Sequence, residues 1–255
     1  MEQQLSQYLE PQLVGVTILC LLVIALLCEY LWAYIKMTYG LTVYNTTNNL
    51  VIDNTYKNMG LRSKTAFSLG SGGEQTITLS GANNPLLFIS SSNQVGVIEA
   101  GLSGSTYTWV IRAAASSSGN VYVFDDPITA TSTYGLKVLD SSGNQVFNSD
   151  NKYIRVIDVF SCSFSGNGFN TTANTPTISR SYSSGNYAVC MATPRAGFDG
   201  FNTGVIRTDA ITTTSTSISI SNTITKSFAG PWSSHTGLLI TSGSVLAMTI
   251  DVTGY

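Results

Sequence analysis

Hydrophobic and polar residues alternate with a period of two through most of the chain after residue 36, as in a β-strand with one buried face. Clear examples are TYTWVIR around Trp109, STSISISN around Ile218, and SVLAMTIDV near the C-terminus. Glycine, asparagine, serine or proline separates these segments, and none of them carries a helical stripe of useful length. The pattern predicts a mainly β fold, with short antiparallel strands packed as β-sandwiches.

The pattern before residue 37 is different. Residues 13–28 read LVGVTILCLLVIALLC without a charge, and the apolar character resumes after Glu29 as far as Ile35. As a helix, residues 13–35 would rise roughly 34 Å, enough to cross a bilayer core of about 30 Å. We therefore predict one transmembrane-type α-helix within residues 1–36. Its apolar face holds Leu13, Val16, Leu19, Leu22, Val23, Leu26 and Leu27, and Tyr30, Trp32 and Tyr34 stand where an interfacial aromatic belt is expected.

Two environments stay open for this helix. It can insert into a membrane, or it can be buried against copies of itself, because a free helix of this hydrophobicity would aggregate in water. Glu2 and Glu10 precede it and Lys36 follows it, so the positive-inside rule places the β part on the cytoplasmic side of a membrane. Met37 stands as an alternative start of the chain.

Charge is scarce: 10% of the 255 residues are charged, and the formal net charge is −2. Of these charges, three acidic residues and one basic residue lie in residues 1–36, which leaves 11 of each sign after it. Nucleic-acid binding as a main activity is excluded, because it needs clustered lysine and arginine. The β part is expected to stay soluble through the hydroxyl and amide side chains of its serine-, threonine- and asparagine-rich segments.

An internal repeat is the most specific feature of the sequence. Residues 39–62 (YGLTVYNTTNNLVIDNTYKNMGLR) align without a gap on residues 134–157 (YGLKVLDSSGNQVFNSDNKYIRVI) at an offset of 95. Seven of the 24 aligned positions are identical. In each copy Leu-x-Val leads into a polar turn and Val-x-Asp/Asn follows it, which predicts a β-hairpin. We place two β-sandwich-like domains at residues 37–130 and 134–255, joined by the PITATST segment after Asp126.

These blocks resemble a family of virion proteins from tailed bacteriophages, whose members begin Met-x-Tyr-Gly-Leu-x-Val and often carry a second Tyr-Gly-Leu-x-Val block. The resemblance covers about a quarter of the chain. It implies a structural component of the tail tip or tail fibre, and it implies no catalytic residues. Family members start near the equivalent of Met37, so the preceding apolar segment is an addition.

The resemblance also sets the expected partners and location. We expect a homo-oligomer, a trimer by analogy with tail fibres, in contact with other tail proteins and assembled in the host cytoplasm. Attachment to a host receptor and membrane penetration through residues 13–35 extend this hypothesis. The alternative is a membrane-anchored spike or adhesin, and a glycan depolymerase comes third.

Candidate chemistry is sparse. Asp125 and Asp126 could form the carboxylate pair of a glycosidase, but VYVF before them and Pro127 after them favour a strand end and a turn. His235 is the single histidine and there is no Cys-x-x-Cys motif, so we expect no metal or cofactor and no enzymatic activity. Cys162 and Cys190 are expected as free, buried thiols, with a disulfide between them as the alternative.

Aromatic residues in polar loops are the usual anchors for sugars or protein partners. Two stretches have this character, RAGFDGF and PWSSHTG. The tentative recognition surface that they predict consists of Phe198, Phe201, Trp232 and His235. Ordinary packing at a sandwich corner is the alternative interpretation of these residues.

Overall fold

The computed structural model describes residues 42–44, 50–52, 57–129, 134–163, 177–193, 196–199, 205–227 and 244–255. Its contacts divide the chain into two compact units, Met1–Thr42 and Val43–Tyr255. All the described strands belong to the second unit and all pair antiparallel, so the predicted mainly β fold is confirmed.

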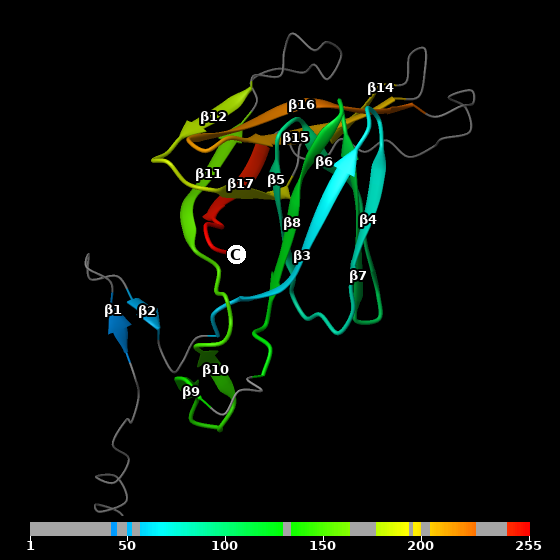
Figure 1. Ribbon diagram of the computed structural model, residues 1–255. Coiled ribbons are helices and arrows are strands. Elements are labelled where there is room, and N and C mark those ends of the chain that lie inside the picture. The colour runs from blue at the N-terminus through cyan, green and yellow to red at the C-terminus, as the bar shows by residue number, and fades with distance from the viewer. Residues whose placement is uncertain are drawn as a thin grey trace, which may run out of the picture. The chain divides into compact units, whose positions relative to one another are not determined.

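Two large sheets form the body of this unit (Figure 1). The first sheet runs, in spatial order, β11 (Val156–Ser163), β17 (Ser244–Asp251), β13 (Tyr187–Thr193), β5 (Leu86–Ser91), β8 (Ser117–Asp125) and β3 (Gly60–Leu69). The second sheet runs β12 (Ile178–Ser181), β16 (Ser217–Ser227), β15 (Val205–Thr213), β6 (Val95–Ser103), β7 (Thr106–Ala113) and β4 (Glu74–Leu79), and the short β14 (Ala196–Asp199) also pairs with β15.

A hairpin precedes the sheet strands in each half of the chain. The first consists of β1 (Val43–Tyr44) and β2 (Leu50–Ile52), and the second of β9 (Lys137–Leu139) and β10 (Gln145–Asn148). Both therefore form where the sequence repeat predicts them. Their pairings correspond at the same offset of 95 residues, and in both the register shifts where the repeated valine, Val51 or Val146, has no partner.

The same correspondence continues through the sandwich. Each hairpin is followed by strands that enter both sheets, so that β3, β8 and β5 in the first half match β11, β17 and β13 in the second. In the other sheet β4, β7 and β6 match β12, β16 and β15. Even a local irregularity recurs at the offset of 95: the register of β3 shifts between Leu61 and Ser63, and that of β11 between Val156 and Asp158. The chain is thus a structural duplication.

The two halves meet with internal two-fold symmetry. Equivalent strands pair antiparallel across the seam, β5 with β13 in one sheet and β6 with β15 in the other. Ile89 lies opposite Val189, which sets Phe88 opposite Cys190. Phe88 and Cys190 occupy equivalent places in their repeats. Each pairs with a residue of the neighbouring strand, β8 or β17, and that residue lies three positions before the aspartate at the end of its strand. A two-fold axis between the repeats requires equivalent residues to lie opposite each other at the seam, as Phe88 and Cys190 do.

This joining corrects the predicted domain division. Residues 37–130 and 134–255 were expected to form two sandwiches, and the repeat does separate them in sequence. In the structure each half supplies three neighbouring strands to each large sheet, and the halves share one core. The reason is that backbone groups at the edges of β5, β13, β6 and β15 satisfy one another across the seam.

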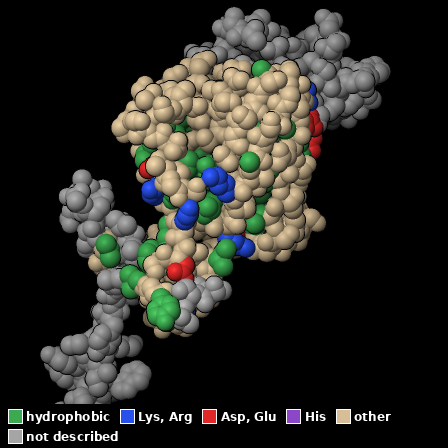
Figure 2. Space-filling view, in the orientation of Figure 1, with side chains coloured by type: hydrophobic (Ala, Val, Ile, Leu, Met, Phe, Trp, Pro, Cys, Tyr) green, Lys and Arg blue, Asp and Glu red, His purple; other side chains and the backbone are tan. Residues whose placement is uncertain are grey.

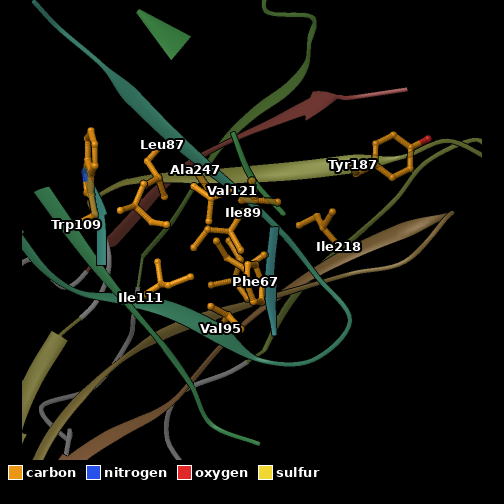
Figure 3. Close-up of a cluster of buried hydrophobic side chains, with 14 of the residues drawn as sticks. Phe67, Leu87, Ile89, Val95, Trp109, Ile111, Val121, Tyr187, Ile218 and Ala247 are labelled. Carbon is orange, nitrogen blue, oxygen red and sulfur yellow. The ribbon is translucent and has the colours of Figure 1, made fainter. Parts of the chain in front are cut away.

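The shared core lies between the two sheets (Figure 3). It draws Phe67, Ile89 and Val121 from the first sheet, Ile111 from the second sheet, and Val189 from the second half. Along β7 the burial alternates as the sequence predicts for a strand with one buried face. The side chains of Trp109 and Tyr187 stand at opposite ends of the view in Figure 3.

A second apolar cluster covers the other face of the first sheet. Phe88, Tyr122 and Phe124 point into it, and the rings of Phe88 and Phe124 meet edge to face at 5.6 Å between centroids. The segments before β3 and β11 and the C-terminal turn up to Tyr255 pack against this cluster. Strand β8, between β5 and β3, is therefore buried on both faces, which agrees with its unbroken apolar run VYVF.

Candidate interaction surfaces

Most of the residues predicted to function lie outside the described part of the chain. This applies to the apolar and aromatic residues of the predicted N-terminal helix and to Phe201, Trp232 and His235. Phe198 lies in β14, opposite Ile206 of β15, but its side chain is outside the described set. Among the described residues there is no helix long and apolar enough to cross a membrane, and no group of side chains that could hold a metal ion.

The paired aspartates have structural partners. Asp125 is 1% exposed, and its two carboxylate oxygens accept hydrogen bonds of 2.9 Å from the backbone N–H groups of Asn83 and Asn84. Arg62 completes the site, with Nη1 3.4 Å from Oδ2 of Asp125. The neighbouring Asp126 is half-exposed and lies 3.1 Å from Nζ of Lys57. Asp125 therefore anchors the turn before β5. The predicted strand end is confirmed, because β8 ends at Asp125.

Cys190 is the described cysteine side chain, and it is free and buried in the second apolar cluster. Burial raises the pKa of its thiol to about 12, because the thiolate would lose its hydration there. The prediction of a free, buried thiol is confirmed for Cys190. Cys162 lies in β11, opposite Val245, and its side chain is outside the described set.

Three basic side chains surround the C-terminal turn. Lys64 donates to the carbonyl oxygen of Tyr255 at 2.9 Å, and Lys152 donates to that of Gly254 at 2.7 Å. The guanidinium of Arg155 donates to the carbonyl oxygen of Thr253 and lies 4.7 Å from the centre of the Tyr255 ring. These groups fix the turn over the second apolar cluster, and Figure 2 shows the basic side chains gathered there. Their donors serve the fold, so we assign them no ligand.

The seam between the repeats holds a cavity of about 250 Å³. Its lining is mainly apolar and includes Leu87, Val97, Trp109 and Met191. Equivalent positions of the two repeats differ beside this cavity, which Pro85 lines. Pro85 occupies the place that Tyr187 holds in the second repeat, and the Tyr187 ring is buried in the core.

Apolar side chains are also exposed on β11 and β17, on the outer face of the first sheet. Ile157, Val159 and Leu246 are each more than two-fifths exposed. The equivalents of Val159 and Leu246 in the first half are Lys64 and Asn120, so the fold does not need an apolar residue at either place. This face is a candidate contact surface, but its chemistry indicates no particular partner.

Among the described residues, the most exposed large apolar side chain lies at the start of the β9–β10 hairpin. Tyr134 is 86% exposed and Leu136 is 47% exposed, and Leu139 and Ile128 are also exposed. Figure 2 shows apolar side chains on the surface of this part of the molecule. Beneath them Val138 and Val146 are buried. The hairpin therefore has a small interior of its own and an apolar exterior.

The hairpin is tied firmly at both ends. At its base Asn148 is buried: its backbone N–H donates to the Tyr153 hydroxyl at 2.6 Å, and its amide group donates to the Ile128 carbonyl at 3.1 Å. At its tip the Asp140 carboxylate accepts hydrogen bonds from Ser142 and Asn144. The side-chain hydrogen bond from Asn144 is the main reason why the pKa of Asp140 is lowered. These bonds hold the exposed side chains on a rigid support.

No protein family, no curated protein and no solved structure matches the chain in the comparisons.

The sequence anticipated this hairpin but not its exposed surface. The predicted recognition residues were aromatics expected in polar loops, whereas Tyr134 belongs to the repeated motif, which predicts a strand. The signal that could have pointed to it is the identity of Tyr39 and Tyr134 in two copies that differ at most other positions.

Proposed function

We propose that this protein is a structural virion component of a tailed bacteriophage, placed in the tail tip or tail fibre. The observation that carries the proposal is the duplicated Tyr-Gly-Leu-x-Val block, which resembles such proteins and forms the same hairpin, with the same register shift, in both copies. The proposed role is architectural. Host attachment is a further part of the proposal, through the segments that hold Phe198, Phe201, Trp232 and His235.

The composition of the β part supports an architectural role. Residues 37–255 hold 11 acidic and 11 basic side chains, and the described ion pairs other than Arg62–Asp125 are partly or largely exposed. A surface of hydroxyl and amide groups imposes little long-range repulsion on neighbouring subunits. Such a surface suits a protein packed among copies of itself and other tail proteins, with a trimer as the proposed state.

Purified phage particles test this proposal. An antibody raised against the exposed turn at residues 140–144 should label one end of the tail in negative-stain images, and mass spectrometry of the particles should recover peptides of the chain. Labelling on the capsid would contradict the proposed place. Absence of the protein from particles would refute the proposal altogether.

A membrane-anchored spike or adhesin is the second candidate, favoured by the uncharged residues 13–28 and the aromatic residues that follow them. The two candidates differ in orientation: the charges around the segment place the β part in the cytoplasm, whereas an adhesin must present it outside. Protease treatment of intact expressing cells separates them, because only an adhesin would lose its β part. Neither proposal includes a catalytic step, and polysaccharide degradation that Asp126→Asn abolishes would contradict both.

A further inference from the structure

The cavity at the seam is built from both repeats and from both sheets. Leu87 of β5 belongs to the first repeat and Met191 of β13 to the second, and both strands lie in the first sheet. Val97 of β6 and Ile211 of β15 line the cavity from the second sheet. Because these strands pair across the seam, the complete cavity exists only in the joined sandwich.

The cavity has the size of a small organic molecule. Its volume is about 250 Å³, whereas an apolar cavity of about 150 Å³ in a protein core is enough to bind benzene. In proportion, a molecule of about ten non-hydrogen atoms fits here. Ala100 and Ala192 line the cavity and are exposed, so a ligand can reach it from the surface without unfolding of the core.

The lining of the cavity selects against charged ligands. Among the described residues that form it, none has a charged or hydroxyl-bearing side chain. An ion bound there would lose its hydration, and no opposite charge would compensate for the loss. A neutral and mainly apolar molecule keeps most of the free energy that it gains by leaving water. The chemistry of the walls therefore defines the class of ligand.

Trp109 adds one polar requirement. It lines the cavity, is 9% exposed, and lies at one end of the core beside Leu87 (Figure 3). Its ring stacks on that of Tyr107 at 5.8 Å between centroids, and the Tyr107 hydroxyl donates to the Asn83 carbonyl oxygen at 2.9 Å, which holds both rings in place. No acceptor for the indole N–H of Trp109 occurs in the part of the chain that the structure describes. That N–H is left to water, and a ligand that displaces the water loses affinity unless it brings an acceptor.

We propose that the seam cavity is a binding site for a small neutral molecule, mainly apolar and with one hydrogen-bond acceptor that the Trp109 indole N–H recognises. The walls come from strands of both sheets, so the site is formed before the ligand arrives and little conformational freedom is lost on binding. The bound molecule stabilises the joining of the two repeats, because only the folded chain offers the site. The site belongs to the sandwich itself and does not depend on a place in a phage tail.

Two probe molecules of the same shape test the site, acetophenone and cumene, because only acetophenone has an acceptor. The full-length chain carries ¹⁵N-tryptophan and is kept in an amphipathic polymer, which keeps residues 13–35 dispersed without free detergent tails that could enter the cavity. The chain has three tryptophans, so its spectrum holds three indole N–H signals, and Trp109→Phe identifies that of Trp109. Acetophenone should move this signal along a saturable curve with a dissociation constant below about 1 mM. In ligand-detected titrations Trp109→Phe should weaken acetophenone about tenfold more than it weakens cumene, because only acetophenone loses a hydrogen bond.

A matched pair of variants places the binding in the cavity. Ala100→Phe adds a ring at an exposed position of the lining and should raise the dissociation constant of acetophenone about tenfold or more. Leu102→Phe, on the same strand β6 and 59% exposed outside the lining, should leave it unchanged. No binding of acetophenone up to its solubility limit, equal affinities of Ala100→Phe and the unaltered protein, or equal losses for both compounds in Trp109→Phe would overturn the proposal. None of these outcomes depends on whether antibodies find the protein in a phage tail.

Discussion

The seam between the two repeats provides the sharpest prediction about the fold, through the substitution Phe88→Ala. Phe88 is fully buried, lies on β5 opposite Cys190 of the other repeat, and packs edge to face on Phe124. Replacing a buried phenylalanine by alanine destabilises a core by about 3–5 kcal/mol, from lost burial and the cavity left behind. A domain of ordinary stability has about 5–15 kcal/mol in total, so the loss should be obvious.

The pattern of the loss matters more than its size. If both sheets are continuous across the seam, the whole sandwich should unfold in one transition, at a lower denaturant concentration and with an unchanged m-value. Hydrogen exchange followed by mass spectrometry should show protection lost together in β8 of the first repeat and β17 of the second. Both strands belong to the same sheet as β5.

Independent halves would behave differently. The variant would then show two transitions, with peptides from β17 keeping their protection while those from β8 lose it, and that result would refute a shared core. Leu102→Ala serves as the control, because Leu102 is 59% exposed and its truncation should change the stability by less than about 0.5 kcal/mol.

Three further predictions concern single sites. Asp125→Asn should destabilise the fold by about 2–3 kcal/mol in denaturant melts, because two backbone N–H groups lose a charged acceptor. Asp126→Asn, at the exposed neighbour, should change the free energy of unfolding by less than about 1 kcal/mol. Equal effects of the two substitutions would contradict the anchoring role of Asp125. Cys190 should resist alkylation in the folded protein. Because folding raises the pKa of its thiol, its contribution to stability is complete below about pH 8.5 and falls as the pH rises toward 12. Peptide mapping of the alkylated protein and alkaline melts of Cys190→Ala check this, and rapid labelling of the native thiol at neutral pH would disprove it. Gly135→Ala should destabilise the hairpin by about 1–3 kcal/mol, because the φ of 118° at this position favours glycine. Hydrogen exchange should show lost amide protection around Ser149 while the sandwich stays intact. Unchanged protection there would show that the backbone needs no glycine at this position.

Part of the second apolar cluster could have been recognised from the sequence. The run VYVF at residues 121–124 has four consecutive apolar residues, the signature of a strand buried on both faces. An interpretation based on alternation alone treats it as a strand with one buried face. The residues that cover it, among them Met59, Ile154 and Tyr255, could not be found in this way, because they come from segments far apart in the sequence.

The candidate surfaces show the same limit. The sequence motif suggests a strand residue at Tyr134, and an aromatic residue in a strand is more often buried. In the structure Tyr134 lies before β9, and its exposure depends on which other segments cover it. Phe198 was expected in a polar loop but lies in strand β14. As recognition residues Phe198 and Trp232 remain predictions, because the structure does not describe their side chains.

Several strands and both hairpins could be predicted from the sequence, including the offset of 95 residues that relates the hairpins. These features follow from local physics: alternation of polarity decides which face of a strand is buried, and Asp, Asn and Gly fix the turns. The tertiary structure alone decided that the two repeats share two sheets and one core. That joining uses backbone hydrogen bonds between the edges of β5 and β13 and of β6 and β15. Every residue except proline offers the same backbone groups, so edge pairing leaves no signature in the order of side chains.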